Sequence, residues 1–186
     1  MGSPAMRASH LKENVASLRK LRPASVEAIL ARVPETVAAI ENAARTEWLD
    51  IHHDVALTGA ANAVLGLQGV RDFNRDALVV SLQGPLLNTL WRAAIALFGL
   101  KPSGLFRWAP QAWPQIYRDV GELSLDAAHH RLQLKGMPLH VWESHAWLEG
   151  TAGAFEAVYA LCSAPGGVDV ERGVPGAADF VLRGPA

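Results

Sequence analysis

Apolar residues in the first two thirds of the chain recur at the three- and four-residue spacing of amphipathic helices. Several of these segments also carry helix signals, such as a proline in the first turn at Pro34 and Pro85, or a glycine exit at Gly66 and Gly99. The segment from Pro85 to Gly99 has the clearest pattern of all. The spacing predicts helices over residues 8–21, 34–44, 54–66, 70–80, 85–99 and 103–120.

Two of these predicted helices contain residues with a special local role. Asp54 comes just before an apolar segment and is typical of an N-terminal cap, because its carboxylate can accept a hydrogen bond from the first turn. In the helix over 103–120, Pro110 and Pro114 each remove a backbone donor. We therefore expect a kink or a restart near these two prolines.

After Gly121 the helical spacing changes to an alternation of apolar and polar residues, which is typical of strands with one face in water. Leu123 and Leu125 alternate with polar neighbours, and so do Leu132 and Leu134. The same alternation returns near the C-terminus. The pattern predicts two hairpins, over residues 122–135 and 168–183.

The segment between the hairpins, "SHAWLEGTAGAFEAVYALC" over residues 144–162, reads as one helix with small residues among bulky ones. A glycine inside a helix costs about 1 kcal/mol relative to alanine, so Gly150 and Gly153 indicate that a sheet, another helix or a ligand approaches closely. We expect the sheet there, with Trp147 and Phe155 filling the space beside the glycines. The predicted fold class is α+β: an N-terminal helical bundle packed on a four-stranded antiparallel sheet, with a helix between the two hairpins.

The length of 186 residues and the apolar half of the composition suit a single domain over 1–186. We expect a helical part over 8–120 and a ββαββ part over 121–184. Residues 1–7 are expected to lie outside the fold, disordered or left from cloning, because "MGSP" precedes Ala5 and Met6.

Charge and cysteine content exclude several classes of partner. The chain has 17 basic and 18 acidic side chains, so its net charge is -1, and no basic stripe predicts nucleic-acid binding. Asn88 and Arg92 interrupt the most apolar stretch, which predicts no membrane span. A single cysteine, Cys162, and no secretory signal lead us to expect a cytoplasmic protein.

The segments "FGLKPSGLFRWAPQAWPQIYRDVGELSL" and "WLEGTAGAFEAVYALC" resemble an uncharacterised family of myxobacterial proteins. More distantly they are similar to the superfamily of 4-vinyl reductase domains, haem-binding nitric-oxide sensor domains and subunits of Golgi tethering complexes. The resemblance covers roughly residues 45–184. It implies a helical bundle that packs on an antiparallel sheet and encloses an apolar cavity, and it implies a homodimer.

The high number of tryptophans, six, is the most informative feature of the composition. One interpretation is an aromatic-walled pocket for a hydrophobic or aromatic small molecule, with Arg107, Arg118 and Glu149 as available polar groups. The plainer interpretation is that the tryptophans fill the core, where each buried indole N–H needs a partner. The candidate ligand-binding residues are Trp113, Tyr117, Trp147, Gly150, Gly153 and Phe155.

No sequence pattern supports a metal, a cofactor or catalysis. His145 and Glu149 share a helix face, but a metal site needs at least three converging ligands. In the haem sensors of the superfamily that this chain resembles, the iron-binding histidine lies on the helix before the sheet and a Tyr-x-Ser-x-Arg motif binds the propionates. Here the helix over 103–120 has no histidine, and the chain has no such motif. Cys162 is expected to be an inert core cysteine, since no cation or helix N-terminus activates it.

We therefore expect a small-molecule-binding or sensory domain that is not an enzyme, with no cofactor and no metal. The alternative is a protein-interaction or scaffold subunit of the tethering-complex type, with a filled core and no ligand. Exposed apolar residues on the helices of residues 8–44 would favour this alternative.

Overall fold

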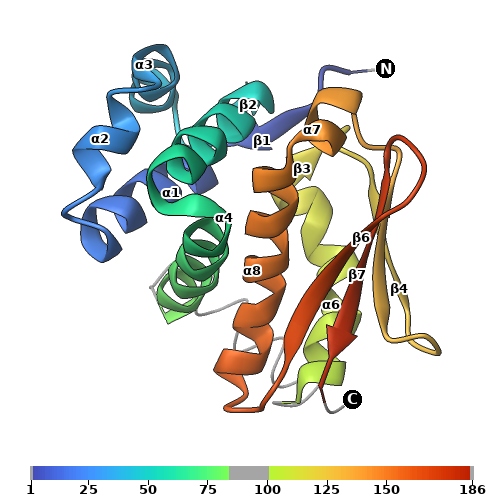
Figure 1. The fold of residues 1–186 in the computed structure, drawn as a ribbon. Coiled ribbons are helices and arrows are strands. Elements are labelled where there is room, and N and C mark those ends of the chain that lie inside the picture. Colours follow the sequence, from blue (N-terminus) through green and yellow to red (C-terminus); the bar gives the residue numbers. More distant parts are fainter. Residues whose placement is uncertain (1, 84–100, 185–186) are drawn as a thin grey trace.

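The computed structural model describes residues 2–83 and 101–184 (Figure 1). The predicted helix over 85–99 lies outside the described residues. The helices are α1 (Ala8–Leu21), α2 (Val26–Leu30), α3 (Pro34–Asn42), α4 (His52–Gln83), α6 (Pro102–Ile116), α7 (Leu139–Glu143) and α8 (His145–Leu161). The strands are β1 (Ala5–Arg7), β2 (Trp48–Asp50), β3 (Tyr117–Arg118), β4 (Glu122–Asp126), β5 (Arg131–Lys135), β6 (Gly167–Arg172) and β7 (Ala177–Arg183).

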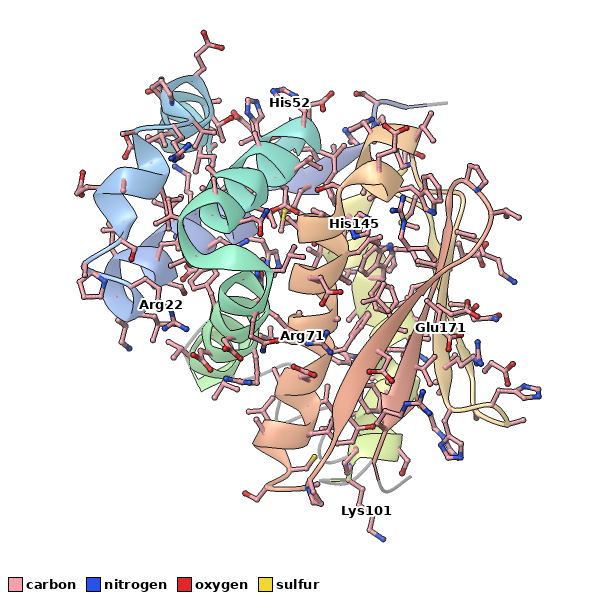
Figure 2. All side chains as sticks on the ribbon, in the orientation of Figure 1. Arg22, His52, Arg71, Lys101, His145 and Glu171 are labelled. Atoms are coloured by element: carbon pink, nitrogen blue, oxygen red, sulfur yellow. The ribbon has the colours of Figure 1, made fainter. Side chains whose placement is uncertain are left out.

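The two hairpins predicted from the alternation are confirmed, and they join into one four-stranded antiparallel sheet of order β4-β5-β7-β6. Strands β5 and β7 link the hairpins, with Leu132 opposite Phe180 and both side chains fully buried. Their charged neighbours lie on the other face, where Arg131 forms ion pairs with Glu171 and Asp179 (Figure 2). The α+β fold predicted from the sequence is therefore confirmed.

Helix α8 is the element between the helical part and the sheet (Figure 1). It packs against α4 on one side and against β6 on the other, and α6 packs against β4. Its N-terminus is fixed by Ser144, whose hydroxyl accepts a hydrogen bond of 3.2 Å from the backbone N–H of Trp147. The central position explains why α8 is apolar around most of its circumference.

The glycines of α8 face another helix, so the expectation that they lie against the sheet is wrong. A side chain at Gly153 would overlap the backbone carbonyl of Arg71 in α4, and one at Gly150 would come within 2.9 Å of the Asn74 side chain. These two positions let the backbones of α4 and α8 meet. The sheet contacts other residues of α8.

The long helix α4 combines two predicted helices. Gly66 has a φ of 73° and a ψ of 170°, so the helix bends there, as the glycine exit predicted. Such a positive φ is costly for residues with a side chain. The helix begins at His52 rather than after Asp54, and the Asp50 carboxylate accepts a 2.9 Å hydrogen bond from the His52 backbone N–H. The capping role expected of Asp54 is therefore wrong.

Helix α6 runs through both of its prolines, so the expected restart does not occur. Each proline removes one hydrogen bond between successive turns, while the packing of Phe106 and Trp113 in the core holds the helix in place. The helix ends at Ile116, and Tyr117 begins β3. Tyr117 therefore lies on a strand and not on the predicted helix.

A second sheet of order β2-β1-β3 was not predicted from the sequence. Met6 in the central strand is 4% exposed and pairs with Leu49 on one side and Tyr117 on the other. Ala5–Arg7 thus belong to the fold, and the expectation that residues 1–7 lie outside it is wrong for these three. This small sheet connects the N-terminus, the start of α4 and the end of α6.

The contact between α4 and α8 makes a prediction about two glycines. We expect Gly153→Ala to lower the free energy of unfolding by at least about 2 kcal/mol, because the new methyl group forces the two helices apart. The matched control is Gly59→Ala in α4, where an added Cβ meets nothing within 4 Å. This change should stabilise the protein by about 0.5–1 kcal/mol. Urea unfolding of the two variants measures both effects, and an unchanged stability of Gly153→Ala would contradict the close approach.

Candidate functional site

Three of the expected ligand-binding residues meet in one aromatic cluster. Trp113 comes from α6, Tyr117 from β3 and Trp147 from α8. Their ring centroids are 4.2 Å apart for Trp113 and Tyr117, 5.8 Å for Tyr117 and Trp147, and 6.3 Å for the two tryptophans. Rings at these distances touch each other. The structure therefore brings these residues together as a packed cluster.

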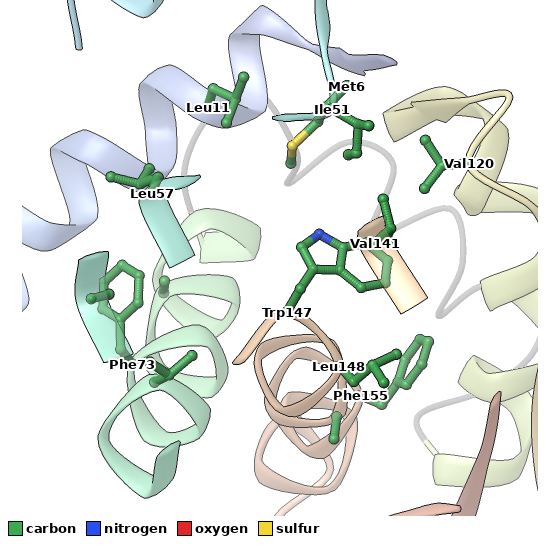
Figure 3. Close-up of a cluster of buried hydrophobic side chains, with 14 of the residues drawn as sticks. Met6, Leu11, Ile51, Leu57, Phe73, Val120, Val141, Trp147, Leu148 and Phe155 are labelled. Carbon is green, nitrogen blue, oxygen red and sulfur yellow. The ribbon is translucent and has the colours of Figure 1, made fainter. Parts of the chain in front are cut away.

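Both tryptophans of the cluster are buried, and both indole N–H groups have partners. Trp113 is 8% exposed and donates a hydrogen bond of 3.1 Å to the carbonyl oxygen of Gly121. Trp147 is 2% exposed, and in Figure 3 its ring lies in the core close to Ile51 and Val141. This pairing matches the plainer interpretation of the tryptophans as residues of the core.

The partner of Trp147 is the buried carboxyl group of Asp54. The indole Nε1 donates to Asp54 Oδ2 at 2.7 Å, and Asp54 is 5% exposed. Burial raises the pKa of Asp54 to about 6, and the hydrogen bond from Trp147 offsets part of this rise. Burial also raises the pKa of Tyr117 well above its ordinary value, and the charge of Asp54 adds to the effect. The sequence pattern assigned Asp54 to a helix cap and so missed this group.

The other three expected site residues lie elsewhere on α8. Phe155 packs edge-on against Phe180 of the sheet, with centroids 5.0 Å apart. Gly150 and Gly153 lie under α4, as described above. The six residues therefore occupy three separate surroundings and do not line one common space.

A buried ion-pair network joins α4, α8 and β6, and sequence reasoning missed it (Figure 2). Arg71 donates to Glu149 Oε2 at 2.7 Å and to Glu156 Oε1 at 2.8 Å, and it also hydrogen-bonds the carbonyl oxygen of Val168. Burial opposes the charge of Arg71, but the hydrogen bonds and charges of Glu156 and Glu149 outweigh it and raise the pKa of Arg71. Glu149 and Glu156 flank Gly153 on one face of α8. Two glutamates on a face that packs against another helix could have indicated a basic residue on that helix.

The polar residues considered for a metal have other partners. Glu149 binds Arg71, and His145 contacts the guanidinium of Arg172. Within residues 2–83 and 101–184, no three histidine, cysteine, aspartate or glutamate side chains lie close enough to hold a metal ion. Cys162 ends α8, and burial raises the pKa of its thiol, which opposes formation of a reactive thiolate.

A cavity of about 130 Å³ that is open to solvent on one side is lined by residues of α6, α8 and the four-stranded sheet. Phe106 of α6 and Tyr159 of α8 form one wall, with ring centroids 5.3 Å apart. Tyr159 is twelve residues after Trp147, or about 18 Å along the helix. The cavity is therefore at the opposite end of α8 from the aromatic cluster. Its lining among the described residues is Ser103, Phe106, Arg107, Leu125, Ala127, His130, Tyr159, Leu182 and Gly184.

No protein-family model matches the chain, and no curated protein matches it. A solved structure described as "Probing the function of heme distortion in the H-NOX family" matches with a TM-score of 0.60 at 12% sequence identity. The match covers 96% of this chain and 93% of that chain. The chain shares that fold. This finding supports the part of the resemblance that concerns the fold, because the H-NOX fold is related to the superfamily named above.

The residues of this chain do not fit a haem. Helix α6, which precedes the four-stranded sheet, carries no histidine. Near Trp113 the space between α6 and α8 holds the contacting rings of the aromatic cluster. The likeness to the H-NOX structure therefore concerns the fold alone.

None of the helices within the described ranges combines the length and the hydrophobicity that crossing a membrane requires. The cytoplasmic location and the homodimer stay predictions. The division into a helical and a ββαββ part of a single domain also stays a prediction.

The raised pKa of Asp54 predicts that stability falls as the pH rises. Between about pH 4 and pH 6 the folded protein holds a proton on Asp54 that the unfolded chain releases, so protonation favours the fold at low pH. A shift of about two pKa units corresponds to on the order of 2–3 kcal/mol. Asp54→Asn keeps an acceptor for Trp147 and should remove this dependence. Urea unfolding from pH 4.5 to 7.5 tests it: an equal stability difference between the variants at every pH would refute the burial of a titrating Asp54.

The Arg71 network predicts a large cost when its cation is removed. Arg71→Met leaves Glu149 and Glu156 without their cation and with limited access to water, since their side chains are 25% and 13% exposed. We expect the free energy of unfolding to fall by about 2–4 kcal/mol at pH 7. The control is Arg19→Met, which breaks an ion pair with Glu41 whose side chains are 54% and 56% exposed. Its cost should stay below about 1 kcal/mol. Similar losses for both variants would contradict a structural role specific to Arg71.

Proposed function

We propose that this chain is a small-molecule-binding sensory domain and that its ligand occupies the cavity between α6, α8 and the four-stranded sheet. The observation that supports the proposal is the H-NOX-like fold. The hollow whose walls include Phe106, Leu125, Tyr159 and Leu182 is where we place the ligand. The proposed site lies at the other end of α8 from the residues first considered, Trp113, Tyr117 and Trp147.

The size of the cavity limits the ligand. A cavity of about 150 Å³ in another protein holds benzene, and drug-sized ligands need about 300 Å³ or more. The volume here is about 130 Å³ and is open on one side, so we propose a ligand no larger than a single ring or a short chain. We propose binding without catalysis, because a catalytic site needs several converging ionisable groups and the described lining is mainly apolar.

The alternative function, a protein-interaction module, has less support. It predicts exposed apolar residues on the helices of residues 8–44. Among the described residues, the exposed large hydrophobic side chains are Leu67 at 44%, Leu139 at 55% and Val174 at 73%, and none of them lies in that range. Isolated residues of this kind are ordinary on a protein surface. We therefore favour ligand binding.

The test uses two alanines of the turn between β4 and β5. Both alanines are exposed, but Ala127 is part of the cavity lining and Ala128 is not. Benzene at about ten times its dissociation constant should stabilise the wild-type protein by about 1.4 kcal/mol, or about 2–4 °C in Tm. Ala127→Phe places a ring at the cavity and should abolish this rise, whereas Ala128→Phe should retain it.

Thermal unfolding gives the rise in Tm, and amide NMR shifts show where benzene binds. Shifts at Phe106, Tyr159 and Leu182 that vanish in Ala127→Phe would support the proposal. The absence of shifts at these residues in the wild-type protein would refute it.

A further inference from the structure

The rim of the proposed ligand cavity carries one guanidinium, that of Arg107. The other polar residues of the lining are Ser103, His130 and Tyr159, and none of the nine lining residues in the described part of the chain is acidic. A guanidinium is positively charged in proteins. An anionic group on a ligand would therefore be favoured at this rim, and a cationic group would be disfavoured.

The carboxylates on the turn and strands that carry part of the lining have partners of their own. Asp126, one residue before Ala127 of the lining, accepts a 2.8 Å hydrogen bond from Nδ1 of His129. Asp179 on β7 pairs with Arg131 at 3.2 Å, and Asp169 on β6 pairs with Arg183 at 2.7 Å. Among the described residues, no hydrogen bond or ion pair joins any of these three carboxylates to Arg107.

The backbone fixes His130 at this rim. Its carbonyl oxygen accepts a hydrogen bond of 2.8 Å from the backbone N–H of Leu182, which is also part of the lining. Its φ of 51° turns the chain sharply between β4 and β5. The backbone of His130 is therefore fixed at this turn, and His130 and Arg107 of α6 line the same cavity.

Resting on the proposed function, we infer that the ligand is a small organic carboxylate. Its apolar part, one ring or a short chain, occupies the space lined by Phe106, Leu125 and Tyr159. Its carboxylate lies at the rim and accepts two hydrogen bonds from the guanidinium of Arg107, a pairing that matches the planar geometry of both groups. His130 contributes a further ring nitrogen at the same rim.

The experiment compares benzoate with benzamide, which has the same shape and no charge, in the wild-type protein and in Arg107→Gln. We expect benzoate to bind the wild-type protein at least tenfold more tightly than benzamide. Arg107→Gln should weaken benzoate binding at least tenfold and change benzamide binding less than twofold. The control is Lys135→Gln, which removes one positive charge from the exposed end of β5 and should leave both affinities unchanged.

Amide NMR titration measures the affinities and locates the ligand, and circular dichroism confirms that each variant is folded. Equal binding of benzoate and benzamide, with both lost in Ala127→Phe, would overturn the inference about charge while the cavity proposal stands. Benzoate binding that Arg107→Gln removes and Ala127→Phe leaves intact would place the anion on the surface and overturn the inference. If neither compound nor benzene binds the wild-type protein, both proposals fail.

Discussion

The architecture depends on the place where the backbone of α8 meets the backbone of α4. Gly153 allows the contact, because any side chain there would occupy the position of the Arg71 carbonyl. The side chain of the same arginine then reaches past the contact to Glu149, Glu156 and the start of β6. One residue thus uses its backbone to set the distance between two helices and its charge to attach the sheet to them.

A second polar interaction holds α8 nearer its N-terminus, where Trp147 donates to the buried Asp54. Both attachments connect α8 to the helical part of the molecule, and both involve α4. The cavity lies beyond them, near Tyr159 and the C-terminal end of α8. Both interactions therefore hold the helix along the part that packs on α4, and the cavity lies at its other end.

Much of the fold could be predicted from the sequence, because strands of five to seven residues and amphipathic helices are long enough for the spacing of their apolar residues to be recognised. The small sheet could not, because strands of two or three residues are too short to show one. The sequence could not predict which element the two glycines of α8 contact. Gly150, Thr151, Ala152 and Gly153 are all buried, so α8 is covered on every side and has no polar face that would show which side the sheet occupies. The ion-pair network could not be predicted, because Arg71 and Glu149, 78 positions apart, meet only through tertiary packing.

The strand order β4-β5-β7-β6 leaves β4 and β6 as the outer strands of the four-stranded sheet. Both carry acidic side chains, with Glu122 and Asp126 on β4 and Asp169 and Glu171 on β6. Charged side chains on the outer strands oppose edge-to-edge pairing with a second copy. The alternation that reveals these strands in the sequence therefore also protects the protein from aggregating through added strands.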